Sequence, residues 1–157
     1  MTRQIPPAPP PAPLPARLPD WPERLAAMFT AHAELPFRWG EHDCFIFAAA
    51  AVQALTGADP LGALRGQWHC RRSAAALLRA TGGGIAGAVS SRLGPPMASP
   101  VWAQRGDIVL VRGAAPGSLH RRWLGVCDAD RVRGPGPQGM ASVGMEQALL
   151  AWGVGHG

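Results

Sequence analysis

The stretch FRWGEHDCFIFAAAAVQALTG, residues 37–57, decides the fold that we expect for this chain. It passes from a loop containing Trp and Gly into an Ala-rich apolar run, which predicts a helix from Cys44 to about Thr56. Asp43 is a typical N-cap residue, and Gly57 is a typical helix stop. Cys44 is therefore expected in a first helical turn, where free amide donors and the helix dipole favour a thiolate.

Three more helices are predicted from local signals on either side of this stretch. Residues 20–33 begin with Asp20 as a cap, and Glu23 follows three residues later in a capping-box arrangement. Residues 73–83 start with a serine at the cap position, and residues 84–94 form a weaker apolar repeat that ends at Gly-Pro-Pro. The expected helices thus all lie within residues 20–94.

Beyond these helices the pattern changes to short apolar runs bounded by Gly and Asp. Residues 106–113 and 122–128 are expected to pair as antiparallel strands. A third strand is expected near 131–133 or near 140–143, and a last short element near 148–154. Helices followed by strands predict an α+β fold, with the helices packed on a small antiparallel sheet.

The N-terminal segment has a different composition from the rest. Residues 5–19 contain eight of the seventeen prolines, which exclude a helix or a central strand and favour an extended polyproline conformation. We therefore expect a Pro-rich arm over residues 1–19 and one domain over residues 20–157. The arm is either a disordered tail or a segment that lies along a neighbouring subunit.

Composition restricts the class of protein. All fifteen basic residues are Arg, but they are scattered, so the net charge of +5 favours a solvated surface over a nucleic-acid face. Three cysteines, an odd number, do not indicate a disulfide framework. The start of the chain lacks the apolar segment of a signal peptide, and no apolar run is long enough for a membrane span. We expect synthesis in the cytoplasm.

The motifs around the cysteine resemble a known class of enzymes. WG-x-x-DC-x-x-F at a helix start, followed by RGDIVLV and WLGV, resembles the NlpC-type branch of the papain-like cysteine peptidases, which cleave peptidoglycan. The same segments with the final AW-x-V are more closely similar to an uncharacterised family of small proteins encoded among phage tail genes. The resemblance covers roughly residues 21–154, and it implies an NlpC-type domain in which Cys44 matches the nucleophile.

The resemblance fails at the catalytic base. The position of the family's histidine, just before the Gly-hydrophobic pair of a strand, holds Trp123, and an indole has no lone pair with which to accept a proton. Two other histidines are candidates for the base. His120 lies three residues upstream of Trp123, and His42 lies two residues before Cys44.

The resemblance and the missing base together suggest three functions. The favoured one is a structural component of a phage tail tip or a phage-like particle, built on an inactive peptidase scaffold. Its partners would be other tail or baseplate proteins, contacted through the arm and the Gly/Pro loops. The alternatives are an active peptidoglycan endopeptidase or amidase, and a nucleic-acid-binding module. No cofactor is expected. His42, Cys44, His69 and Cys70 have poor spacing for a zinc site.

Overall fold

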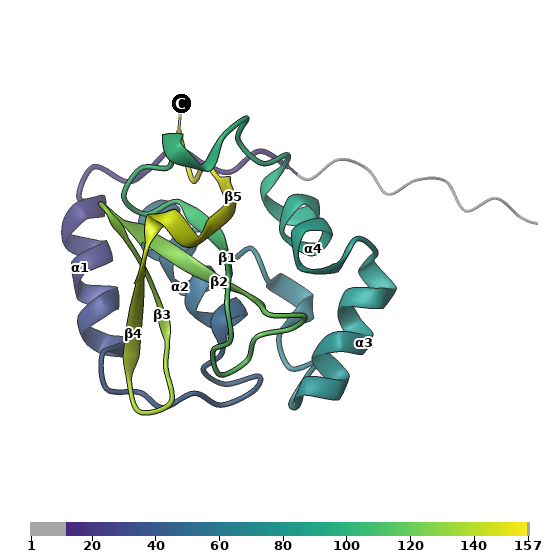
Figure 1. Ribbon diagram of the computed structural model, residues 1–157. Coiled ribbons are helices and arrows are strands. Elements are labelled where there is room, and N and C mark those ends of the chain that lie inside the picture. The colour runs from purple at the N-terminus through teal and green to yellow at the C-terminus, as the bar shows by residue number, and fades with distance from the viewer. Residues whose placement is uncertain (1–11, 157) are drawn as a thin grey trace, which may run out of the picture.

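A computed structural model describes residues 12–156, which form an α+β domain. Most of the expected arm, residues 1–11, and Gly157 lie outside the described residues. Four helices precede a five-stranded sheet (Figure 1), as the order of sequence patterns predicted. The helices are α1 (Trp21–His32), α2 (Cys44–Thr56), α3 (Arg71–Thr81) and α4 (Gly84–Leu93).

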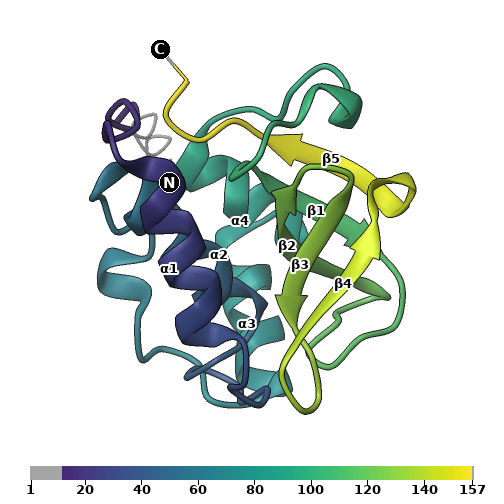
Figure 2. The same cartoon turned by 90° about the vertical axis from the view of Figure 1, so that its left-hand side faces the viewer.

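The sheet is antiparallel throughout, with the strand order β4-β3-β2-β1-β5. Both segments that were alternatives for the third strand are strands, and they pair with each other. The helices lie on one side of the molecule and the sheet on the other (Figure 2). The strands are β1 (Ile108–Arg112), β2 (Arg122–Asp128), β3 (Arg131–Pro135), β4 (Met140–Gly144) and β5 (Ala148–Trp152).

The main core lies between α2 and the sheet. Phe47, Val52 and Leu55 of α2 are fully or almost fully buried, as Ala-rich apolar helices are when they pack on a sheet. From the sheet, Ile108 and Leu124 point toward the helices. The two layers pack through apolar side chains, with small alanines on α2 that let the strands come close.

The capping predicted for two helices is wrong in detail. Asp20 occupies the N-cap position of α1, but its side chain makes no cap hydrogen bond; it binds Arg24 instead, at 2.8 Å. At α3 the cap is Cys70, whose sulfur accepts from the Ser73 amide at 3.4 Å, so the cap lies three residues before the serine that the sequence pattern indicated. A cysteine does not indicate a helix start in a sequence, because Ser, Thr, Asp and Asn are the strong N-cap residues.

The last residues of the Pro-rich segment are bonded to the domain. Arg17 donates from Nη2 to Asp107 Oδ1 at 3.0 Å and from Nε to the Val154 carbonyl at 2.8 Å. Asp107 has no exposed surface, and its Oδ1 also accepts from the Val154 amide at 3.0 Å and contacts His156 Nε2 at 2.7 Å. The Arg17 amide donates to the Gly155 carbonyl at 3.2 Å. We call these five residues the terminal latch.

Candidate functional site

Asp43 organises the loop from which Cys44 emerges. One of its carboxylate oxygens accepts from the Phe45 and Ile46 amides, each at 3.0 Å, which is the predicted N-cap. The other oxygen accepts from the Gly40 amide at 2.7 Å and from the Trp68 indole at 2.6 Å. Asp43 is fully buried, so these four bonds replace all its contact with water. They fix the start of α2 and hence the position of the thiol.

Cys44 is the first residue of α2, where the sequence placed it, but its side chain is closed off from solvent. Only 1% of Cys44 is exposed. Burial raises the pKa of the thiol to about 12, although the backbone amides of Leu124 and Phe45 favour the thiolate. The Phe45 amide at the helix terminus thus acts in the expected direction, but desolvation, together with the Asp43 charge, outweighs it. At neutral pH the group is a thiol.

Trp123 and Leu124 point to opposite faces of β2, because side chains alternate along a strand. Leu124 lines a cavity on the helix side with Phe45, whereas Trp123 lines an open groove of about 660 Å³ with the Gly/Pro loops. The indole lies over Gly134, where an added Cβ would come within 2.6 Å of Cζ3. The indole is therefore packed on the sheet face away from α2.

The two candidate bases lie in different surroundings. His120 is exposed and occupies a tight turn bounded by the Leu119–Arg122 bridge, with φ at 53°. His42 is 5% exposed and stacks on His32, with ring centroids 5.2 Å apart. Within residues 12–156 no hydrogen bond joins either imidazole to the Cys44 sulfur. The three residues that the sequence grouped are thus not assembled into a hydrogen-bonded pair or triad.

His42 has an unusual environment of its own. Its Nε2 is buried without a hydrogen-bond partner among the described residues. Burial and the neighbouring His32 lower the pKa of His42, and the Asp43 charge opposes this. The native state therefore binds a proton on His42 less readily than the unfolded chain does.

Because the pKa of His42 is lower in the native state, the domain is expected to be less stable in acid. The unfolded chain binds more protons than the native one once the pH falls below about 6.5, the usual histidine pKa. The free energy of unfolding should decrease as the pH drops from 7 toward 5, by at most about 1.4 kcal/mol per pH unit for one group. Urea unfolding at each pH measures it. His42→Phe should flatten the dependence and exposed His69→Phe should not; equal slopes in both variants would contradict the assignment.

The sequence patterns did not reveal two buried hydrogen-bonding contacts, one in the Cys44 loop and one in the terminal latch. Trp68 donates to a carboxylate 25 positions earlier in the chain, a contact that no local pattern predicts. Asp107 lies in the segment RGDIVLV, which predicted only a strand, although its carboxylate binds both ends of the domain. The only signal in the sequence was the place of Asp107, next to a Gly at the start of an apolar strand. A carboxylate that is buried at such a place must find hydrogen-bond donors.

Comparison with known proteins supplies a family and no activity. A family model described as a domain of unknown function, DUF6950, matches residues 16–154, so the matched region includes the terminal latch up to Val154. No curated protein and no solved structure matches the chain. No helix within residues 12–156 is long and apolar enough to cross a membrane. No group of three metal-ligating side chains occurs in the same span. The chain belongs to the DUF6950 family.

Proposed function

We propose that this protein is a non-catalytic structural component of a phage tail tip or a related particle, built on an NlpC-type scaffold. The observation that carries the non-catalytic part is the state of Cys44, which is buried and carries a pKa of about 12. A cysteine nucleophile reacts as the thiolate and must reach its substrate. Neither requirement is met in the described conformation.

Neither candidate histidine is placed to remove the proton from the Cys44 thiol. A general base has to lie within about 2.6–3.2 Å of the proton it removes, directly or through one water molecule. His42 is engaged with His32 and Phe47, and His120 is exposed in a turn. Trp123, at the position where the resemblance expects histidine, faces the groove on the other side of the sheet.

The tail location rests on the sequence resemblance described above. The motifs from the Cys44 loop to the final strand are similar to those of small proteins encoded among phage tail genes. Surfaces suited to contacts with neighbours are present: the groove of about 660 Å³ is bordered by Pro116, Pro135 and Pro137 and by Glu146. Rigid, proline-bordered surfaces lose little conformational entropy on binding.

One observation favours the alternative of an active cell-wall peptidase. Cys44 is still at the N-terminus of α2, capped by Asp43, and the Leu124 and Phe45 amides favour its thiolate. Backbone amides at a helix start are also the kind of donor that stabilises an oxyanion, although the Phe45 amide is bonded to Asp43 here. An opening motion that exposed Cys44 to water would restore part of this chemistry.

Thiol reactivity separates the two functions, and the chain contains its own control. Cys70 is partly exposed, and hydrogen bonds from the Ser73 hydroxyl and amide lower its pKa. Burial raises the pKa of Cys127 to about 11. Iodoacetamide at pH 7.5 should therefore modify Cys70 first and leave Cys44 and Cys127 unmodified, as peptide mass spectrometry would show.

The same samples test for hydrolysis. Purified muropeptides incubated with the native protein and with Cys44→Ala should give identical chromatograms. Rapid alkylation of Cys44 at neutral pH, together with product that disappears in Cys44→Ala, would exclude the structural proposal and establish the peptidase. Alkylation confined to Cys70 with no product would exclude the peptidase.

A further inference from the structure

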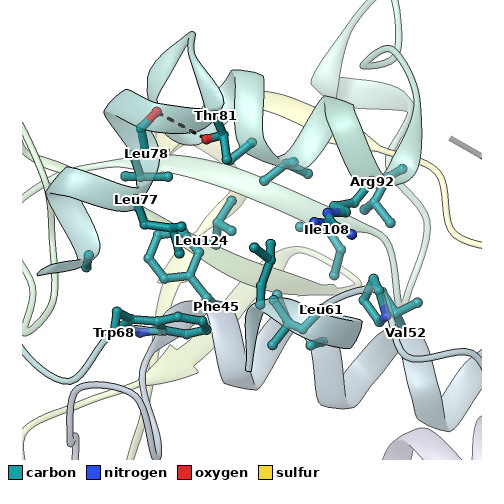
Figure 3. Close-up of a pocket in the computed structure, with 18 residues that line it drawn as sticks. Phe45, Val52, Leu61, Trp68, Leu77, Leu78, Thr81, Arg92, Ile108 and Leu124 are labelled. Carbon is teal, nitrogen blue, oxygen red and sulfur yellow. Dashed lines mark hydrogen bonds between the residues drawn. The ribbon is translucent and has the colours of Figure 1, made fainter. Parts of the chain in front are cut away.

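An apolar cavity opens between the helices and the sheet, separate from the groove at Trp123. Its volume is about 80 Å³, and α2, α3, α4 and the helix-facing side of β1 and β2 enclose it. Figure 3 shows Phe45 and Trp68 at one end of the lining and Val52 and Arg92 at the other. The cavity is partly open to the surface, so a ligand can enter it without unfolding of the domain.

The size and lining of the cavity select for an apolar group. A water molecule needs only about 10–15 Å³ of such space, but it also needs two to four polar partners. Here the walls are almost entirely aliphatic and aromatic, with Leu61, Leu77 and Leu124 among them. A short stretch of hydrocarbon fills such a space more favourably than water does.

One charged side chain lies at the opening of the cavity. Arg92, in the last turn of α4, is the one charged side chain among the described lining residues. In Figure 3 its guanidinium reaches from α4 over the cavity toward Ile108. Within residues 12–156 Arg92 has no recorded hydrogen bond or ion pair, whereas Arg17, Arg65 and Arg133 are each paired with a carboxylate.

We propose that this cavity binds a single-chain aliphatic carboxylate. The hydrocarbon occupies the space between α2 and α3, and the carboxylate accepts charge-assisted hydrogen bonds from Arg92. The guanidinium fork suits a planar, two-oxygen anion better than a spherical one. Each methylene moved from water into the cavity raises the binding constant about fourfold. A cationic head would meet like charge at the same position.

The test uses three ligands with the same chain and different heads: octanoate, octanol and octylamine. Calorimetric titration of the full chain should rank them octanoate, then octanol, then octylamine. Arg92→Gln should weaken octanoate about tenfold, the usual size of a lost charge-assisted contact, and leave octanol unchanged. Arg79→Gln is the matched control, because Arg79 also lies in the last turn of an adjacent helix but does not line the cavity.

Two further measurements test where octanoate binds, separately from how tightly it binds. The Trp68 indole signal in a ¹H–¹⁵N spectrum should shift on addition of octanoate, and Ala88→Leu, which fills the cavity from α4, should reduce binding of both octanoate and octanol. The proposal is overturned if octanoate does not bind, if it binds Arg92→Gln as tightly as the native chain, or if Trp68 does not respond. It is also overturned if only phosphatidylglycerol vesicles, and not octanoate, bind through Arg92.

Discussion

Asp43→Ala is expected to destabilise the domain more than any other single change at the start of α2. The substitution leaves the amides of Gly40, Phe45 and Ile46 and the Trp68 indole without their acceptor. Each buried donor left unsatisfied costs about 1–3 kcal/mol, and relaxation recovers part of the sum. We expect a loss of about 3–5 kcal/mol, a large part of a domain's typical stability of about 5–15 kcal/mol.

Asp20→Ala is the matched control for Asp43→Ala. Both residues are aspartates at a helix N-cap position, but Asp20 is exposed and makes no cap hydrogen bond. Its replacement should leave the melting temperature nearly unchanged, whereas Asp43→Ala should lower it by about 10 °C, given about 2–4 °C per kcal/mol for a chain of this size. Similar shifts in both variants would show that the four bonds to Asp43 do not stabilise the loop.

The second large effect is expected at the terminal latch. Asp107→Asn removes the charge opposite Arg17 and places an amide NH₂ where the carboxylate accepts on both sides, from the Val154 amide and from the Gln104 amide. One of these donors must then face another donor. Because the side chain of Asp107 is fully buried and that of Arg17 is only 10% exposed, the loss should be about 2–4 kcal/mol.

Hydrogen exchange shows whether this loss occurs at the latch. In Asp107→Asn the amides of Arg17 and Val154, which donate within the latch, should exchange faster, while amides in the centre of β2 should change only as the global stability does. Asp59→Asn serves as the control, since the Asp59–Arg65 pair is partly exposed and such pairs contribute at most about 1 kcal/mol. Unchanged exchange at Arg17 and Val154 would refute the latch as a stabilising contact.

Local signals determined the elements that the sequence predicted correctly. The start and end of α2 follow from Asp43 and Gly57, and both residues act as their chemistry requires. The sheet was foreseen as antiparallel, but β3 and β4 were offered as alternatives because their Gly- and Pro-rich sequence weakens the strand pattern. In the structure each supplies the pairing partner of the other.

Side-chain direction and distant contacts were beyond the sequence. The run RWLGVCD is apolar at consecutive positions, so it does not reveal that Leu124 faces α2 and Trp123 faces the groove. The burial that sets the pKa of Cys44 depends on how α2 packs on β2, which no local pattern encodes. The bonds of Asp43 to Trp68 and of Asp107 to Arg17 join residues 25 and 90 positions apart.

The terminal latch has a mechanical consequence. Because Arg17 and Gly155 are tied to one another and to Asp107, tension applied at the two ends of the domain acts first on these few bonds and reaches the strands only after they break. A domain pulled from both ends would thus yield first at the terminal latch while the strand pairing stayed intact, and the latch would re-form once the force ceased.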